Sequence, residues 1–341
     1  MPVKVFHKQT FLYWLLSIIG IALVIWAIPA RGAKQSVTNQ LLAKQKVLTR
    51  AEANNVSTFF TVFGESVAVM AQLKSIEARN ADAQHNLDAF VEQWRESNLN
   101  GGIITTNKNG VVDIHSSVTG IVDLGEDLSD REYFVWAQDA QKGEYFVGKP
   151  IISRLGATEG ELIVAVASPI FNGDEFDGAI AASVKLVPLM QRYLDLMKVA
   201  DDSQVFLLDE GGELIYTSSD KYSYGANVFD YFAKYPFKGS EVLVEKTKTA
   251  LAESKEGSLR TSFIDPEDAS VKNYLVSYSP VLVGGKKWML VITSPANEVW
   301  ELTVPIYTRL AFLGIFVSLT VLAFGIFVRK EVEAVTPQNK L

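Results

Sequence analysis

Residues 127–137, which read DLSDREYFVWA, bring together side chains suited to binding a small molecule. Arg131 carries a planar guanidinium, whose N–H donors pair bidentately with a carboxylate or a phosphate. Tyr133 and Trp136 follow closely, and each offers a flat apolar face with one polar group. The segment therefore predicts a pocket for an anionic ligand, with Arg131 as the residue that binds it.

The same segment also fits the start of an α-helix. Ser129 as N-cap and Glu132 three residues later would form a capping box. Arg131 would then lie on the surface, and Tyr133 and Trp136 would be ordinary core residues. The two interpretations are compatible, because the capping box uses only Ser129 and Glu132.

The sequence argues against an enzyme. The absence of cysteine excludes thiol nucleophiles, disulfides and thiolate metal sites. Asp113 and His115 lie two residues apart, a spacing that can orient a histidine for catalysis, but no G-x-S-x-G or H-E-x-x-H motif accompanies them. We expect no catalytic residue, no metal and no cofactor. The net charge of −7 also argues against nucleic acid as a partner.

Two uncharged apolar segments predict membrane-spanning helices. Residues 11–29 and 310–328 each contain 19 residues without a charge. A run of about 18 or more apolar residues is long enough to cross the hydrocarbon core as a helix. We therefore expect one spanning helix at 11–29 and a second at 306–328.

Basic residues flank both segments on the side away from the middle of the chain: Lys4, Lys8, Arg329 and Lys330. Positive charge accumulates on the cytoplasmic side, so we expect residues 1–10 and 329–341 inside a bacterial inner membrane and the region between the spans outside. Neither terminal segment is long enough to fold alone. We therefore expect no catalytic or adaptor domain on the cytoplasmic side.

The region after the first span predicts a long helix over residues 33–75. Its apolar residues Val56, Phe59, Phe63, Val67 and Met70 are 3, 4, 4 and 3 residues apart, which places them on one helical face. We expect this face to pack on a core. A coiled-coil seam, which would make the chain a homodimer, is the alternative.

Two pairs of similar segments indicate a tandem repeat. GGIITTNKNGVVDIHSS (101–117) and SQVFLLDEGGELIYTSS (203–219) each place two β-rich runs around a glycine-containing turn, and they align at an offset of 102 residues. ASPIFNGDEFDGAIAASVKL (167–186) and YSPVLVGGKKWMLVITSPAN (278–297) each predict strand, tight turn and strand, at an offset of 111. Two copies of one unit are the simplest explanation.

The repeat divides the extracytoplasmic region. We expect a membrane-distal module at 76–185, a linker helix at 186–200 and a membrane-proximal module at 201–300. The expected fold class is α+β, with each module a small antiparallel sheet with helices.

Residues 33–300 resemble the double Cache (dCache) sensor domain of bacterial chemoreceptors and sensor kinases. The resemblance rests on G-x-D-L-S-D-R-E-Y-F from Gly125, followed by P-I-I-S, S-P-I-F and F-D-G-A-I, in that order. It implies two PAS-like modules with the ligand pocket in the distal one. There the arginine of the motif grips a carboxylate and aromatic neighbours wall the site.

The motif departs from the amino-acid-binding branch of this family. In that branch tryptophan, tyrosine and aspartate follow the arginine, whereas here the corresponding positions are Tyr133, Phe134 and Trp136. An aspartate of its last strand is replaced by Ser183. The resemblance implies that those two carboxylates hold the ligand's ammonium group.

Their replacement predicts a small carboxylate without an α-ammonium group. Lys149 and Lys185 would favour the same charge if either faces the pocket. The expected ligand-binding residues are Arg131, Tyr133, Trp136, Tyr145 and Ser183.

The expected function is a membrane-anchored sensor that signals through a partner such as a sensor kinase or a chemoreceptor. The alternative is a membrane-anchored assembly protein whose Cache-like domain contacts another protein or the cell wall. A receptor that has lost its output domain is a third interpretation. An enclosed cavity beside Arg131 distinguishes the sensor from the scaffold.

Overall fold

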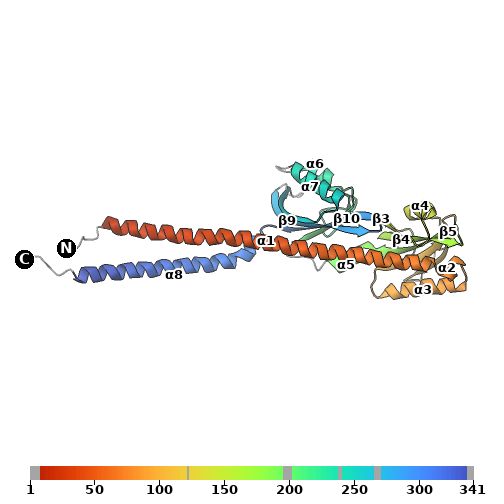
Figure 1. Ribbon diagram of the computed structural model, residues 1–341, viewed down its shortest axis with the longest axis horizontal. Coiled ribbons are helices and arrows are strands. Elements are labelled where there is room, and N and C mark those ends of the chain that lie inside the picture. Colours follow the sequence, from red (N-terminus) through yellow and green to blue (C-terminus); the bar gives the residue numbers. More distant parts are fainter. Residues whose placement is uncertain (1–7, 121–122, 195–201, 237–239, 265–269, 336–341) are drawn as a thin grey trace, which may run out of the picture. The chain divides into compact units, whose positions relative to one another are not determined.

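The computed structural model describes residues 8–120, 123–194, 202–236, 240–264 and 270–335, with only some of the side chains near the two ends (Figure 1). The chain divides into two compact units. One comprises Lys44–Pro295, and the other comprises Met1–Ala43 with Ala296–Leu341.

The terminal unit consists of helical segments. Helix α1 spans Lys8–Ala71 and helix α8 spans Glu298–Val335. Among the described residues, one helical stretch, Thr303–Phe327, is long and apolar enough to cross a membrane. This agrees with the span expected at 306–328.

The span expected at 11–29 is helical in its backbone but is not separated from the long helix, because α1 runs without interruption. Most of its side chains lie outside the described residues, as do those of Lys4, Lys8 and Arg329. The two-span topology and its orientation therefore stay predictions.

The larger unit contains two five-stranded sheets of identical topology. Sheet 1 has the order β2-β1-β5-β4-β3 and sheet 2 the order β7-β6-β10-β9-β8, and all neighbouring strands are antiparallel. The strands of sheet 1 are β1 Asn100–Thr106, β2 Val112–Ser117, β3 Phe146–Ile152, β4 Leu162–Asn172 and β5 Glu175–Lys185. Those of sheet 2 are β6 Gln204–Leu208, β7 Leu214–Thr217, β8 Gly257–Ile264, β9 Val271–Val283 and β10 Lys286–Pro295. The repeat expected from the sequence is therefore present, with each expected hairpin in place.

Short helices connect and cover the sheets. They are α2 Lys74–Glu77, α3 Ala81–Arg95, α4 Glu132–Asp139, the 3-10 turn η1 Gly156–Thr158, α5 Leu186–Leu194, α6 Val228–Lys234 and α7 Ser240–Glu253. Helix α4 covers one face of sheet 1, and α6 and α7 cover one face of sheet 2 (Figure 1). The linker helix was expected at 186–200; α5 lies in the first part of that range, and residues 195–201 lie outside the described part, so its role as a linker stays a prediction.

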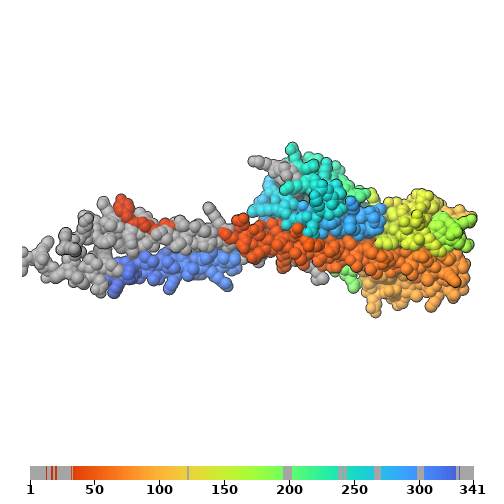
Figure 2. Space-filling view, viewed as in Figure 1, coloured from red at the N-terminus to blue at the C-terminus, as the bar shows by residue number. Residues whose placement is uncertain are grey.

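Helix α1 joins the two sheets through a common core. Val56, Phe59, Phe63 and Val67 are all buried, in one cluster with core residues of both sheets. Met70 is partly buried against the same cluster. The apolar stripe of α1 therefore packs as core, as expected. The opposite face of this part of α1 is exposed beside both sheets (Figure 2).

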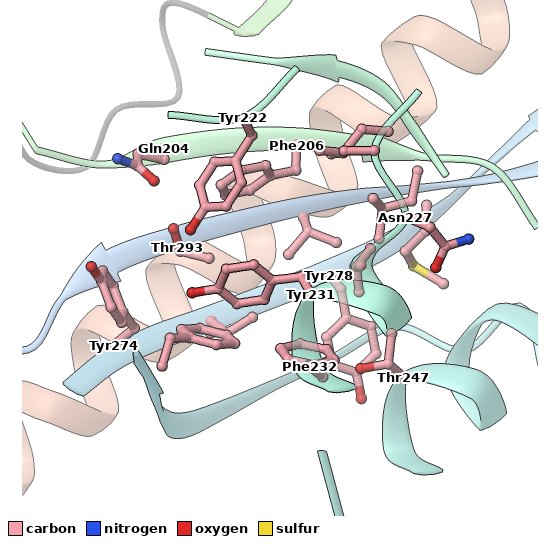
Figure 3. A pocket seen from close by; sticks show the side chains of 18 of the residues that line it. Gln204, Phe206, Tyr222, Asn227, Tyr231, Phe232, Thr247, Tyr274, Tyr278 and Thr293 are labelled. Atoms are coloured by element: carbon pink, nitrogen blue, oxygen red, sulfur yellow. The ribbon is translucent and has the colours of Figure 1, made fainter. Parts of the chain in front are cut away.

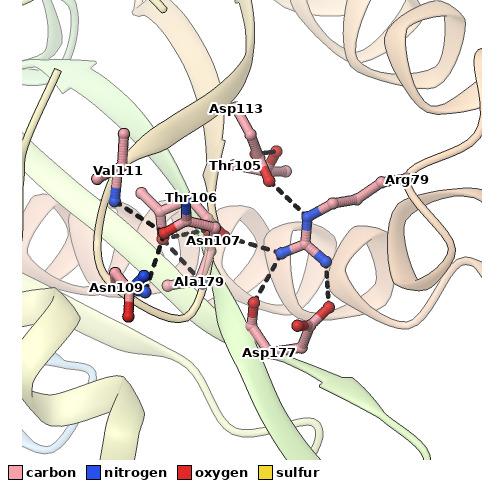
Figure 4. Close-up of polar contacts among 9 residues, drawn as sticks. All are labelled: Arg79, Thr105, Thr106, Asn107, Asn109, Val111, Asp113, Asp177 and Ala179. Carbon is pink, nitrogen blue, oxygen red and sulfur yellow. Dashed lines mark hydrogen bonds and ion pairs between the residues drawn. The ribbon is translucent and has the colours of Figure 1, made fainter. Parts of the chain in front are cut away.

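An arginine network closes one corner of sheet 1 (Figure 4). Arg79, between α2 and α3, donates from Nε to the Asp113 carboxylate of β2 at 2.5 Å. Its Nη1 donates to the Asp177 carboxylate of β5, and its Nη2 donates to the carbonyl oxygens of Thr106 and Asp177 at 2.9 and 2.7 Å. One side chain therefore ties three strands together.

The backbone beside this network requires glycine. Gly178 has φ +142°, and a Cβ there would lie 1.9 Å from the carbonyl oxygen of Thr106. The strands can approach this closely only because no side chain is present.

Candidate ligand-binding site

Residues 127–137, which the sequence indicated as a binding segment, contain the start of α4. Its N-cap is Arg131, with extended φ and ψ of −76° and 135° and no capping hydrogen bond from its side chain. The capping box on Ser129 and Glu132 is therefore wrong. Ser129 instead donates its backbone N–H to the Asp127 carboxylate at 2.9 Å, which lowers the pKa of Asp127. This Asx turn leaves the Arg131 side chain available to line a cavity.

A cavity of about 50 Å³, here called the inner hollow, lies between sheet 1 and the start of α4. Its polar lining consists of His115, Arg131, Tyr133, Ser153, Arg154, Thr158 and Ser183. Among the described residues that line it, none is acidic. The structure thus brings together three of the predicted site residues, namely Arg131, Tyr133 and Ser183.

Two guanidinium groups meet at the inner hollow, and they differ in their partners. Arg154 pairs bidentately with Asp130, with N–O distances of 3.1 and 2.8 Å. This contact lowers the pKa of Asp130 and raises that of Arg154. Arg131 donates only to the Ile152 carbonyl, at 3.4 Å, and forms no ion pair with any described residue. Arg131 therefore retains the uncompensated charge and the donors that an anion requires.

Two neutral groups complete the donor set. Tyr133 is 6% exposed, and burial raises the pKa of its hydroxyl, which stays protonated. The Nδ1 atom of His115 accepts the backbone N–H of Asp123 at 2.9 Å. Burial lowers the pKa of His115, and the nearby Asp123 only partly offsets this. The neutral imidazole consequently carries its proton on Nε2.

The floor of the inner hollow depends on a glycine of β1. A Cβ at Gly101 would lie 2.1 Å from Cγ2 of Thr158 and 2.8 Å from Oγ of Ser183. Ser183 Oγ itself donates to the Gly102 carbonyl at 3.3 Å. A side chain at Gly101 would therefore occupy the space that a ligand needs.

An outer hollow of about 210 Å³ adjoins the inner one. The two share Arg131 and Tyr133, and the outer hollow is also lined by Lys149 and by the acidic Asp130 and Glu132. Arg131 therefore borders both cavities. Of the two lysines expected to favour an anion, Lys149 lines the outer hollow. Both have their Nζ near a carboxylate oxygen, Lys149 at 3.9 Å from that of Asp209 and Lys185 at 3.7 Å from that of Glu161.

Trp136 and Tyr145 are not brought to the inner hollow. The Trp136 ring packs on Phe146, with centroids 5.2 Å apart. The Tyr145 ring packs on α1, where a Cβ at Gly64 would lie 2.3 Å from it. Both side chains serve the packing of sheet 1, and a ligand role for them stays an untested prediction.

Sequence reasoning missed four polar residues of the inner hollow: His115, Ser153, Arg154 and Thr158. The sequence indicated His115 only as a residue that Asp113 could orient. In the structure the Asp113 carboxylate instead accepts hydrogen bonds from Arg79 and Thr105. Arg154 directly follows the P-I-I-S motif, which is the one signal that could have indicated it.

Comparison with known proteins identifies the architecture. Residues 30–303 match the family described as Cache domain. No curated protein matches the sequence significantly.

Three solved structures share the fold. The extracellular domain vpHK1S-Z8, assigned to a histidine kinase, is 13% identical with a TM-score of 0.56, and the match covers 80% of this chain and 96% of that one. A domain assigned to a sensory box/GGDEF family protein of Vibrio parahaemolyticus is 14% identical with a TM-score of 0.55, covering 78% and 99%. The ligand-binding domain of the Campylobacter jejuni chemoreceptor Tlp3, in complex with L-valine, is 13% identical with a TM-score of 0.50, covering 78% and 97%.

Proposed function

Because the chain belongs to the Cache domain family, we propose that it is a membrane-anchored sensor whose first module binds a small carboxylate. The observation that carries the proposal is that, among the described residues, the Arg131 guanidinium has no ion-pair partner and the inner hollow has no acidic lining residue. A carboxylate would meet the Arg131 fork, with the Tyr133 hydroxyl and the Nε2–H of His115 as further donors. The cavity thus offers the donors that an anion accepts.

The size of the cavity limits the ligand. A volume of about 50 Å³ holds only a few water-sized groups, since one probe sphere occupies roughly 10–15 Å³. A carboxylate with one or two further carbons fits the inner hollow, and a longer chain would extend past Arg131 into the outer hollow. We therefore favour a short-chain carboxylate.

An amino acid is the main competitor, because Tlp3 was solved with L-valine. An α-ammonium group needs a carboxylate or several acceptors to replace its water. The inner hollow offers no acidic side chain among its described lining residues. Asp130 and Glu132 face only the outer hollow, and Asp130 is already paired with Arg154.

The proposal places α8 and the start of α1 in the bacterial inner membrane, with the module that carries Arg131 distal and the output passed to a separate membrane protein. One contact and one chain connection support a route to α8. The Nζ of Lys286, on β10, donates to the Glu132 carboxylate at 2.9 Å, and Glu132 directly follows Arg131 in the sequence. Strand β10 ends at Pro295 and α8 begins at Glu298, so a shift of β10 reaches α8 through a two-residue connection.

Ligand binding is tested by thermal unfolding of the full chain in lipid nanodiscs with three probes of one carbon skeleton: propionate, alanine and n-propylamine. Propionate should raise the unfolding midpoint in a saturable manner, because a ligand that binds the native state stabilises it by mass action. Alanine should act more weakly, and propylamine should have no effect. Stabilisation by propylamine, or equally by alanine, would refute the carboxylate assignment.

Variants of Arg131 give the matched control. Arg131→Ala should abolish the propionate shift while leaving the ligand-free midpoint within about 1–2 °C, since the Arg131 side chain makes a single long hydrogen bond with the described residues. Arg131→Lys keeps the charge but loses the bidentate fork and should retain a weakened shift. A full propionate response in Arg131→Ala would remove Arg131 from the site.

Membrane topology is testable because the chain contains no cysteine. Single cysteines at the exposed positions Val271 and Lys330 should differ in labelling by a membrane-impermeant maleimide. Val271→Cys should react in intact spheroplasts and Lys330→Cys only after permeabilisation. Labelling of both in intact spheroplasts would contradict the two-pass orientation.

A further inference from the structure

Sheet 2 carries a cavity of its own on its α6–α7 side, here called the second hollow, which is larger than the inner hollow (Figure 3). This second hollow has a volume of about 200 Å³. It occupies the place in sheet 2 that the inner hollow occupies in sheet 1, because α6 and α7 follow β7 as α4 follows β2. Folded interiors are close-packed and contain few voids larger than a water molecule. A void of this size at a repeated position indicates a binding site.

The walls of the second hollow are apolar and largely aromatic. Alternate residues of three strands point into it, and α6 and α7 supply the cover. The aromatic residues that line the second hollow are Phe206, Tyr222, Tyr231, Phe232, Phe263, Tyr274 and Tyr278. Such walls favour a flat apolar ligand, because aromatic rings pack edge to face or offset against one another.

The charges at the second hollow exclude a cation. Among the described residues that line it, none is acidic, and Lys221 and Lys246 are both present at exposed positions. An aromatic cage can hold an ammonium group, but here no described lining residue supplies a carboxylate to neutralise the charge of such a group. The ligand is therefore not cationic, despite the aromatic walls.

One end of the second hollow is polar. Gln204 of β6 lies opposite Thr293 of β10 in the strand register, and Figure 3 shows both side chains at the end where Tyr274 also lies. Thr293 is 6% exposed. Within the described part of the chain, neither the Gln204 amide nor the Thr293 hydroxyl hydrogen-bonds another protein group. Gln204 is partly buried, so both groups remain available to a polar group from outside the protein.

We propose that the second hollow is a second ligand site, for a small uncharged aromatic molecule that carries one hydrogen-bonding substituent. The ring lies among Phe206, Tyr231 and Tyr278, and the substituent reaches Gln204 and Thr293. The size agrees, because an apolar cavity of about 150 Å³ accommodates benzene, and the second hollow is somewhat larger. This site differs from the carboxylate site in position, charge and ligand, and it does not depend on Arg131.

Benzyl alcohol and benzylamine are the probes, since they share a ring and differ in charge at neutral pH. The full chain in lipid nanodiscs should bind benzyl alcohol with a dissociation constant on the order of 1 mM or tighter, as expected for eight well-buried non-hydrogen atoms. At ten times that concentration the unfolding midpoint should rise by roughly 3 °C. Benzylamine should produce no rise. Stabilisation by 1-octanol but not by benzyl alcohol would overturn the aromatic assignment in favour of an acyl chain.

Filling the cavity tests its location. Val291→Phe on β10 places a ring inside the second hollow and should abolish the benzyl alcohol shift. Val271→Phe makes the same change at a position of the same sheet that is 61% exposed, and it should retain the shift. It also controls for effects of benzyl alcohol on the lipid. Should Val291→Phe fail to fold, Ala250→Leu fills the hollow from α7 with a smaller side chain.

The polar end has its own variant. Thr293→Val keeps the shape and removes the hydroxyl, and it should weaken benzyl alcohol binding by about fivefold to tenfold while leaving toluene binding unchanged. The benzyl alcohol shift should persist in Arg131→Ala. A shift unaffected by Val291→Phe and Ala250→Leu, or one lost in Arg131→Ala, would refute the second site.

Discussion

Replacing Arg79 with methionine removes the charged group that binds β1, β2 and β5 together, and it leaves the backbone conformation of residue 79 as it is. Arg79 has a positive φ of 46°, and methionine has the same Cβ, so the strain at this position stays the same. The aliphatic part of the side chain is also conserved. The variant therefore isolates the guanidinium and its contacts with Asp113, Asp177 and the Thr106 carbonyl.

The expected loss is about 2–3 kcal/mol in the free energy of unfolding. Removing one partner of a buried pair costs roughly 3–5 kcal/mol, because the other charge stays unpaired. Here the Arg79 side chain is 23% exposed and the carboxylates of Asp113 and Asp177 are 24% and 31% exposed, so water compensates part of the loss. At roughly 2–4 °C per kcal/mol for a unit of this size, the unfolding midpoint should fall by about 5–10 °C.

Differential scanning calorimetry of the full chain in nanodiscs measures this midpoint. Arg192→Met is the control, because Arg192 is exposed on α5 and makes no ion pair with a described residue. The double variant Arg79→Met with Asp177→Asn should lose less than the two single variants together, by roughly 1 kcal/mol, because both changes disrupt one network. An Arg79→Met midpoint equal to that of Arg192→Met, or additive losses in the double variant, would refute this account of the corner.

Three further outcomes are expected. Lys286→Met removes the 2.9 Å hydrogen bond to Glu132 and the contact of the ammonium group with the Phe146 ring, 4.5 Å from the ring centroid. The variant should lower the free energy of unfolding by about 1 kcal/mol and weaken the propionate response. Calorimetry with and without propionate measures both effects. The pKa of His115 is lower in the folded protein than in the unfolded chain, because the imidazole is buried. As the pH falls below about 6.5, the unfolded chain therefore binds a proton that the folded protein does not, and the folded state becomes less stable. The midpoint should fall between pH 7.5 and 5, and less so in His115→Gln. Gly101→Ala should abolish the propionate shift and cost about 1–3 kcal/mol, because its Cβ would lie 2.1 Å from a threonine methyl group.

Each outcome has a result that contradicts it. An unchanged propionate response in Lys286→Met would remove the contact from the proposed route to α8. A pH dependence that is identical in His115→Gln would assign it to other groups. Propionate binding in Gly101→Ala would show that the ligand does not occupy the inner hollow.

The alternation of apolar residues and the glycine turns determined the secondary structure and its repetition from the sequence alone. The β9–β10 hairpin illustrates why. Gly284 and Gly285 have φ of 52° and 82°, which a two-residue hairpin turn requires and glycine adopts freely. The stripe from Val56 to Met70 is determined in the same way, because helical spacing alone places its residues on one face. Arg131 was likewise identifiable, since its chemistry and neighbours are adjacent in the sequence.

Other parts of the site depended on the tertiary structure. Arg154 and His115 reach the inner hollow only because strands distant in sequence pair side by side, and no local spacing encodes that proximity. Trp136 and Tyr145 carry the same aromatic chemistry as Tyr133, yet they pack on Phe146 and on α1. Local sequence determines which groups are available. The volume left between a sheet and its covering helices decides which of them face a cavity, because close packing fills the remaining space.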